Sequence, residues 1–164
     1  AARRATRAGT PVKVVLAGAP DTGNPTAMTE AELRAWAAEG LVDWWGFQTD
    51  VRKVWAAAHV AALPSSGEGL PKALLEAASC RRALLATDVA GNREVVLPGE
   101  TGLRVAYQDV AGLTDALVRF AREPEWRRRM AQQARTLVET AFSEGVVVRE
   151  TLDLYRKLAP GAAA

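Results

Sequence analysis

Short apolar segments alternate with longer amphipathic segments along most of this chain. The apolar segments are bounded by glycine, proline or polar turn residues, and this pattern predicts β-strands. We expect five strands, at residues 11–18, 41–47, 59–64, 82–87 and 102–105. After His59, the segment 59–64 contains only apolar residues, which is typical of a strand buried on both faces of a sheet.

Helix-start and helix-stop signals lie between these strands. Thr29 and Glu32 form a T-x-x-E capping box, and the helix that they begin is expected to end before Gly40. Thr49 or Asp50 caps the next helix. Further helices are expected at 71–80 and 91–96, from Asp109, from Pro124 and after Ser143, and the tail 160–164 is expected to be loose.

The alternation of strands and helices predicts one α/β domain over residues 1–164. Its core would be a Rossmann-like parallel sheet between two layers of helices. In such sheets, ligands bind beyond the carboxyl ends of the strands. The candidate binding loops therefore follow Gly18, Phe47, Leu63, Thr87 and Val105.

The composition narrows the classes of protein. Apolar residues make up 49% of the 164 residues and charged residues 24%, as in a globular protein. The net charge of +2 does not favour nucleic acid as a partner. The single cysteine, Cys80, and the single histidine, His59, exclude an intrachain disulfide and a His-rich metal site, and they fit the cytoplasm. We expect His59 to pack in the core.

The segment SSGEGLPKALLE, residues 65–76, contains the chemistry of greatest interest. Pro71 suits the first position of a helix, and Gly69 allows close approach of the backbone to a ligand. The helix N-terminus would bind an anion such as phosphate, and the carboxylates of Glu68 and Glu76 would accept hydrogen bonds from hydroxyls on either side. A nucleoside diphosphate sugar matches this arrangement. The same residues also fit an ordinary helix start.

Residues 63–105 closely resemble the C-terminal domain of family 4 (group 1) retaining glycosyltransferases, which have the GT-B fold. The shared pattern is Pro-Ser, then E-G-x-P-x-x-x-x-E from Glu68 to Glu76, then A-T-x-x-x-G-x-x-E-V from Ala86, then G-x-x-G before a strand. The segments VVLAGAP and WWGFQTDV match upstream, so the resemblance covers essentially the whole chain. It is greatest to bacterial enzymes of surface polysaccharide synthesis.

The resemblance implies roles for the residues of the loop. Glu68 would contact hydroxyls of the donor sugar as the catalytic residue, and Glu76 would bind the ribose. The backbone of Gly69, Leu70 and Pro71 would lie against the diphosphate and the sugar. The resemblance also implies catalysis without a metal ion or cofactor, with the nucleotide sugar as the donor substrate.

Five further positions complete the substrate-binding set that the resemblance implies. Phe47, Gln48 and Val51 would surround the base through main-chain or apolar contacts. Gly18 would let the first strand end close to the nucleotide, and Ser65 belongs to the Pro-Ser pair of the pattern.

Two departures from the family pattern are present. Arg81 and Ala83 stand where the family commonly has Gly and Pro, and a helix-ending residue at Arg81 would adopt a positive φ. The chain also begins without Met and without the family's basic pair, which indicates a fragment that lacks an N-terminal Rossmann-like domain. We expect such a fragment to bind nucleotide weakly and to transfer no sugar.

Two other functions compete with this interpretation. A nucleotide-sugar epimerase of the same fold would lack the E-G-L-P segment. The other is a non-catalytic nucleotide-binding or regulatory domain, such as a flavodoxin-like receiver. A receiver would need an acidic cluster after the first strand, where only Asp21 is present. A lipid-linked acceptor at the inner face of the membrane is a candidate partner. The basic segment 126–135 is expected to be a solvated helix face, with attraction to anionic lipid as the alternative.

Overall fold

The computed structural model describes residues 1–21, 23, 27–40 and 42–158, so the predicted loose tail lies outside the described residues. The elements, in chain order, are α1 (Ala2–Arg7), β1 (Val15–Ala17), α2 (Glu30–Ala38), β2 (Asp43–Gly46), α3 (Val51–Ala57), β3 (Val60–Leu63), α4 (Lys72–Ser79), β4 (Ala83–Thr87), α5 (Ala90–Val95), β5 (Gly102–Val105), α6 (Val110–Arg122), α7 (Pro124–Ala141) and α8 (Glu144–Leu158). All five predicted strands are present; β5 has the predicted bounds, the other four are shorter than predicted, and α1 was not predicted.

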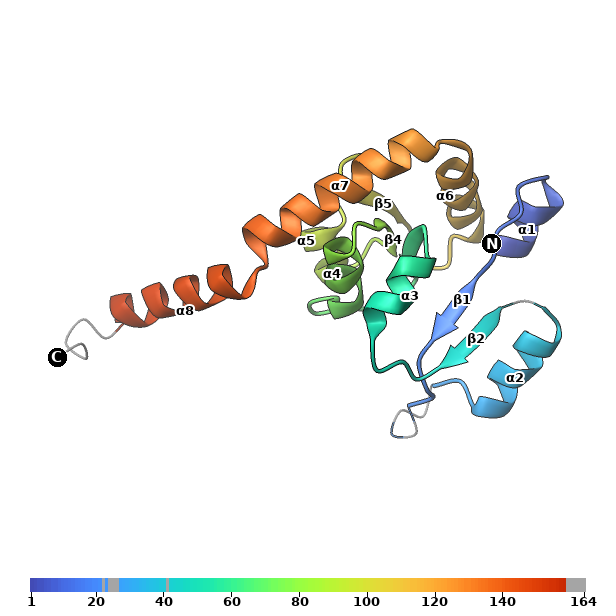
Figure 1. Cartoon of the computed structure of the whole chain (residues 1–164), viewed down its shortest axis with the longest axis horizontal. Helices are drawn as coiled ribbons and strands as arrows, with labels where there is room; N and C mark the ends of the chain where they lie inside the picture. The colour runs from blue at the N-terminus through green and yellow to red at the C-terminus, as the bar shows by residue number, and fades with distance from the viewer. Residues whose placement is uncertain (22, 24–26, 41, 159–164) are drawn as a thin grey trace.

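All paired strands are parallel, which confirms the predicted α/β class. The strands form two sheets rather than one: β1 pairs with β2, and β4 lies between β3 and β5 (Figure 1). The prediction that the segment 59–64 is buried on both faces was wrong, because Ala61 is buried whereas Ala62 is exposed. The reason is that β3 is the edge strand of its sheet and that, among the described residues, α4 is the helix that mainly packs against it, so its two faces are unequally covered.

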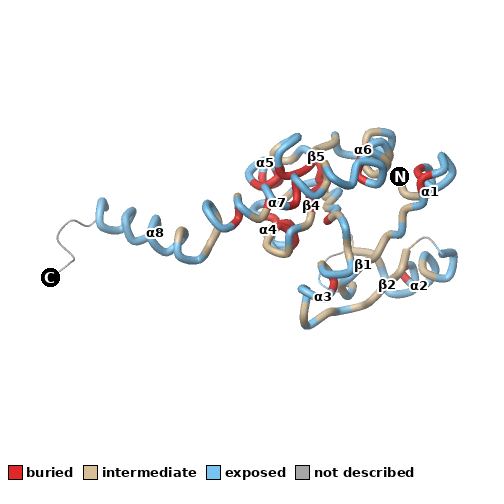
Figure 2. The backbone as a smooth tube through the Cα atoms, turned by 45° about the horizontal axis from the view of Figure 1, so that its top comes forward, coloured by how far each residue is buried: buried red, intermediate tan, exposed pale blue. Residues whose placement is uncertain are grey.

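The strand β4 is the centre of the core. Its five residues are all buried, and the four apolar ones alternate between two hydrophobic clusters. Leu84 and Ala86 face a cluster with residues of α4 and the second half of α7, whereas Ala83 and Leu85 face one that contains Phe120 and Met130. Helices therefore cover both faces of the second sheet, and the buried positions concentrate there (Figure 2).

The helix starts follow local hydrogen bonds. The predicted capping box is confirmed, because the Thr29 hydroxyl accepts from the Glu32 amide at 3.2 Å and the Glu32 carboxylate accepts from the Thr29 amide at 2.7 Å. The N-cap of α3 is Asp50, whose carboxylate accepts from the Arg52 amide at 3.2 Å. Pro71 is the N-cap of α4 rather than its first helical residue.

The end of α4 has the backbone geometry that the sequence predicts. Arg81 has φ 56°, in the region that favours glycine. The Arg82 amide donates to the Ala77 carbonyl at 3.0 Å and the Arg81 amide to the Ala78 carbonyl at 2.9 Å, which is the Schellman pattern. Arg81 therefore occupies a position that strains any residue other than glycine.

The helix α8 extends away from both sheets (Figure 1). None of its residues is buried, and the exposed large apolar side chains on it are Val147, Val148, Leu152, Leu154, Tyr155 and Leu158. In the part of the chain that the structure describes, no helix combines the length and apolar character needed to cross a membrane.

Candidate functional site

The loop that follows β3 lies at the carboxyl edge of the second sheet. It leads from Pro64 to the start of α4, and its exposure changes sharply along its length. Glu68 is half-buried, Gly69 is exposed and Leu70 is 52% exposed, whereas Pro71 is fully buried. Pro71 therefore anchors the loop in the core, while the preceding residues face outward.

Two hydrogen bonds tie this loop to β4 and to the start of α5, and a third joins α5 to β4 beside it. The Thr87 hydroxyl donates to the Ser65 carbonyl, and the Asn92 side-chain amide donates to the Thr87 carbonyl at 3.0 Å. The Gly91 amide donates to the Glu68 carbonyl at 3.2 Å. The first half of the loop, at Ser65 and Glu68, is thus held by β4 and the start of α5.

Gly91 also sets how closely the two segments approach. A Cβ at this position would lie 1.9 Å from the Gly69 carbonyl oxygen and 2.5 Å from that of Glu68. Both neighbours are backbone atoms, so they cannot move away as a flexible side chain could. Only glycine fits here without displacing the loop.

Two buried polar atoms in this support have no hydrogen-bond partner among the described residues, Ser65 Oγ and Asn92 Oδ1. Asn92 is fully buried although its side chain is polar. A buried polar atom without a partner costs about 1–3 kcal/mol, and native structures contain few of them. Their presence beneath one loop is typical of a region shaped by function as well as by stability.

The start of α4 places backbone donors beside the two glutamates. The first amides of a helix have no carbonyl one turn ahead of them, so those of Lys72 and Ala73 are directed at the loop end of α4. Glu76 is exposed and lies four residues after Lys72, which is about 6 Å along the helix axis. In the described part of the chain, no hydrogen bond or ion pair involves the carboxylate of Glu68 or Glu76. Backbone donors at the start of α4 thus lie between Glu68 and Glu76 along the chain.

The other predicted contacts gather around the first sheet. The Gly18 amide donates to the Gly46 carbonyl at 2.8 Å, and the Trp44 indole donates to the Gly18 carbonyl at 2.9 Å. Phe47 is 74% exposed and Val51, which begins α3, is 37% exposed. The Gln48 side chain donates to the Trp45 carbonyl at 2.7 Å.

The structure therefore brings the predicted site residues together in two groups. Gly18, Phe47, Gln48 and Val51 belong to the loops after β1 and β2, whereas residues 65–76 follow β3. No hydrogen bond joins the groups in the described ranges. Gly91 is the glycine of the sequence pattern that begins at Ala86, which gives it no role. The supporting function of Asn92 was missed, because an asparagine inside a short helix gives no sequence signal of burial.

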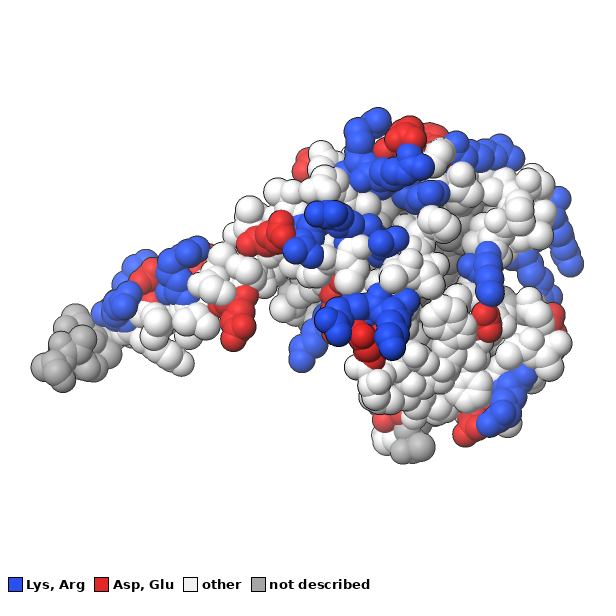
Figure 3. Space-filling model, in the orientation of Figure 1, with Lys and Arg blue, Asp and Glu red and all other residues white. Residues whose placement is uncertain are grey.

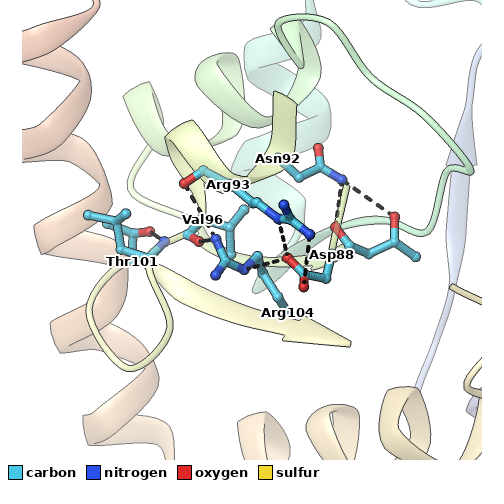
Figure 4. A network of polar contacts seen from close by, with 8 residues as sticks. Asp88, Asn92, Arg93, Val96, Thr101 and Arg104 are labelled. Carbon is cyan, nitrogen blue, oxygen red and sulfur yellow. Dashed lines mark hydrogen bonds and ion pairs between the residues drawn. The ribbon is translucent and has the colours of Figure 1, made fainter. Parts of the chain in front are cut away.

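A second polar network lies next to this support (Figure 4). The Arg93 guanidinium donates to the Asp88 carboxylate at 2.9 Å, and Arg104 reaches the same oxygen from β5 at 3.2 Å. Arg104 also donates to the Val96 carbonyl at 3.2 Å. The hydrogen bond from Arg93, reinforced by the positive charges of Arg93 and Arg104, holds the pKa of Asp88 below its usual value. Asp88 thus links the end of β4 to α5 and β5.

This network predicts a pH dependence of stability. Because the pKa of Asp88 is lowered in the folded state, its contribution is fully present above the unfolded pKa of about 3.9 and is lost as the pH falls through the folded value. We expect Asp88→Asn to be less stable than the wild type above about pH 4 and the difference to shrink below it. Urea unfolding at several pH values measures this, with Asp115→Asn, which removes an exposed carboxylate of α6, as the control. A difference that is independent of pH would contradict the role of Asp88.

Sequence comparison identifies the family. The profile of the family described as "Glycosyl transferases group 1" matches residues 1–123. The chain is 31% identical over 155 residues to the alpha-maltose-1-phosphate synthase of Mycolicibacterium smegmatis, an alignment that covers 88% of this chain and 40% of that protein. The chain therefore spans less than half the length of this relative.

Solved structures give the same fold. Sucrose-phosphate synthase from Thermosynechococcus elongatus superposes with a TM-score of 0.81 at 27% identity, over 97% of this chain and 41% of that one. HepE of Anabaena in complex with UDP-glucose superposes with a TM-score of 0.81 at 19% identity, over 95% of this chain and 44% of that one. These neighbours are GT-B glycosyltransferases, which confirms the predicted fold. With its family profile, its relatives and its fold in agreement, this chain belongs to the group 1 glycosyl transferases.

Proposed function

We propose that this chain is the donor-binding part of a retaining glycosyltransferase, which transfers a sugar from a nucleoside diphosphate sugar to a glycan or lipid-linked acceptor in surface polysaccharide synthesis. The observation that carries the proposal is the loop from Ser65 to Glu76. It places two carboxylates on either side of a helix N-terminus, at the edge of a parallel sheet where ligands bind.

Different residues of the loop bind different parts of the donor. Glu76, exposed on the second turn of α4, accepts hydrogen bonds from the ribose hydroxyls. The backbone of Gly69 to Pro71 and the first amides of α4 hold the diphosphate. Glu68, outside the helix, accepts hydrogen bonds from the sugar. Phe47, Gln48 and Val51, with Gly18 behind them, form the base side of the site.

Catalysis in this proposal depends on the leaving group. Negative charge develops on the nucleoside diphosphate as its bond to the sugar breaks, and fixed dipoles and positive charges stabilise it most in that state. The N-terminus of α4 supplies such a dipole. The proposal assigns the remaining positive charge to basic side chains of the protein and includes neither a metal ion nor a cofactor.

The relatives support a nucleotide sugar as the donor. HepE shares the fold and was solved with UDP-glucose, and three curated relatives are named as synthases or glycosyltransferases. These names favour sugar transfer over the epimerase and over a domain without catalytic activity. The position at the inner face of the membrane stays a prediction.

The proposed enzyme also contains an N-terminal Rossmann-like domain that binds the acceptor. The apolar side chains of α8 support this part of the proposal, because they are exposed on a helix that leaves the second sheet (Figure 1). A helix with such a face normally packs against another element. In the proposal, that element belongs to the N-terminal domain.

A ligand panel tests the proposed function. Thermal unfolding of the full-length protein is measured with UDP-, GDP- and ADP-sugars, each at a concentration well above its dissociation constant. We expect one nucleotide class to raise the melting temperature by a few degrees, because a ligand that binds only the folded state stabilises it. The matching nucleoside, which lacks the diphosphate, is the control. An unchanged melting temperature across the panel would contradict the proposal.

A further inference from the structure

A hollow of about 200 Å³ lies at the opposite edge of the second sheet from the loop 65–76. Its lining residues are His59, Arg81, Arg82, Arg127, Arg128 and Ala131. His59 immediately precedes β3, Arg81 and Arg82 immediately precede β4, and the other three lie on α7. The prediction that His59 packs in the core was wrong, because His59 is exposed at this edge.

Two of the arginines are held in place by backbone carbonyls. Arg82 donates from Nε to the Cys80 carbonyl at 2.9 Å and from Nη1 to the Ala58 carbonyl at 2.7 Å. Arg127 donates from Nη1 to the Phe120 carbonyl. A guanidinium has five N–H donors, so these bonds fix each group and leave further donors for a ligand. The hollow is therefore lined by positioned rather than freely moving charges.

Positive charge exceeds negative charge around the hollow. Partial burial lowers the pKa of Arg127, and the charge of Arg128 acts in the same direction. The acidic partner found there is Glu125, which pairs with Arg128. On the face of the molecule drawn in Figure 3, Lys and Arg side chains gather over α7. An anion between the guanidiniums would relieve this repulsion.

Arg81 adds an independent observation. Its φ of 56° lies where glycine is favoured, and a residue with a Cβ costs roughly 1 kcal/mol or more there. Strained residues are found mainly at functional sites. A large basic side chain therefore occupies, beside the hollow, a position at which the backbone alone would favour glycine.

We propose that this hollow binds a phosphate-bearing anion, at a site separate from the donor site. Its volume is that of several water molecules at about 30 Å³ each, which is room for a phosphate or diphosphate group. The planar guanidinium fork matches phosphate oxygens and binds them through two parallel hydrogen bonds. The source is either a free phosphate compound or the headgroup of an anionic lipid.

Two neighbouring arginines provide a matched test. Arg128 lines the hollow, whereas Arg129 does not, and replacement of either by glutamine removes one charge from an exposed position of α7. Binding of inorganic pyrophosphate is measured by calorimetry at about 0.15 M salt, where distant exposed charges are screened. We expect Arg128→Gln to weaken binding about tenfold or more and Arg129→Gln to change it less than about twofold.

The outcomes separate the proposal from general electrostatics and from the donor site. The proposal would be overturned if Arg128→Gln and Arg129→Gln weakened pyrophosphate binding equally. It would also be overturned if neither pyrophosphate binding nor the vesicle binding described below depended on Arg128. Binding of a nucleoside diphosphate that depends on Glu76 should be unchanged by Arg128→Gln, because the loop 65–76 lies at the other edge of the sheet. If the proposed donor site proves wrong, the test of the hollow is unaffected. If the proposal for the hollow proves wrong, the test of the donor site is likewise unaffected.

Arg81→Gly is the second variant, and its two expected effects are opposite in sign. It should raise the melting temperature by about 2–4 °C, because glycine relieves the strain at a positive φ. It should also weaken pyrophosphate binding severalfold. A variant that is more stable but binds pyrophosphate as tightly as the wild type would show that Arg81 is not part of the site.

The second arm distinguishes the two sources of phosphate. Co-sedimentation is measured with vesicles of phosphatidylcholine alone and with added phosphatidic acid. Capture that needs phosphatidic acid and Arg128, without binding of pyrophosphate, assigns the site to a lipid headgroup. Binding of pyrophosphate that needs Arg128, without vesicle capture, assigns it to a free compound.

Discussion

Replacement of Glu68 by alanine should lower the sugar-transfer rate of the full-length enzyme about 100-fold. Glu68 lies outside α4, at the sugar side of the proposed site, and its carboxylate has no partner in the described part of the chain. Contacts to the sugar that strengthen as its bond breaks act on the transition state more than on the bound substrate. The loss should therefore appear in kcat, with little change in affinity for the nucleoside diphosphate.

Steady-state kinetics and calorimetry on the same preparation check this expectation. Glu100→Ala is the matched control, because it removes an exposed glutamate from the turn before β5. If Glu68→Ala keeps the wild-type kcat, or if it abolishes diphosphate binding instead, Glu68 does not have the assigned role.

Replacement of Gly91 by alanine should displace the loop that contains Glu68. The added Cβ would lie 1.9 Å from the Gly69 carbonyl oxygen, and the backbone would have to move to make room. Overpacking of this kind costs about 1–3 kcal/mol. Small displacements of binding groups lower activity much further, by about 100-fold for 1 Å. We therefore expect reduced stability together with loss of nucleotide-sugar binding.

Gly145→Ala is the control for Gly91→Ala. Both glycines lie in helices, but a Cβ at Gly145 would meet nothing within 4 Å. Alanine favours helix more than glycine does, so Gly145→Ala should leave the free energy of unfolding unchanged or slightly raised. Equal stability of the two variants in urea would show that the contact at Gly91 does not constrain the loop.

The sequence predicted most of the elements because their signals are local. The capping box at Thr29 and the positive φ at Arg81 each follow from residues within a few positions of one another, and the parallel strands follow from the alternation of strands and helices. The helix α1 was missed, since ARRATR has neither a side-chain cap nor an acidic first turn. The division into two sheets was also missed, because strand pairing depends on contacts between distant segments.

The candidate site shows the same limit. The motif from Glu68 to Glu76 marks the loop in the sequence, but the atoms that hold it come from residues 87–92. The tight contact of Gly91 and the burial of Asn92 become visible only when β4 and α5 are placed beside the loop. His59 was predicted to be buried from its neighbours in sequence, yet it precedes an edge strand and is exposed.

The central claim is that the loop 65–76 binds a nucleoside diphosphate with Glu76 on the ribose. Calorimetric titration of wild type and Glu76→Ala with the nucleoside diphosphate tests it most directly. We expect Glu76→Ala to bind the nucleoside diphosphate more weakly by about 1–3 kcal/mol, because hydrogen bonds to a charged acceptor are lost. An affinity for Glu76→Ala equal to that of the wild type would contradict the assignment.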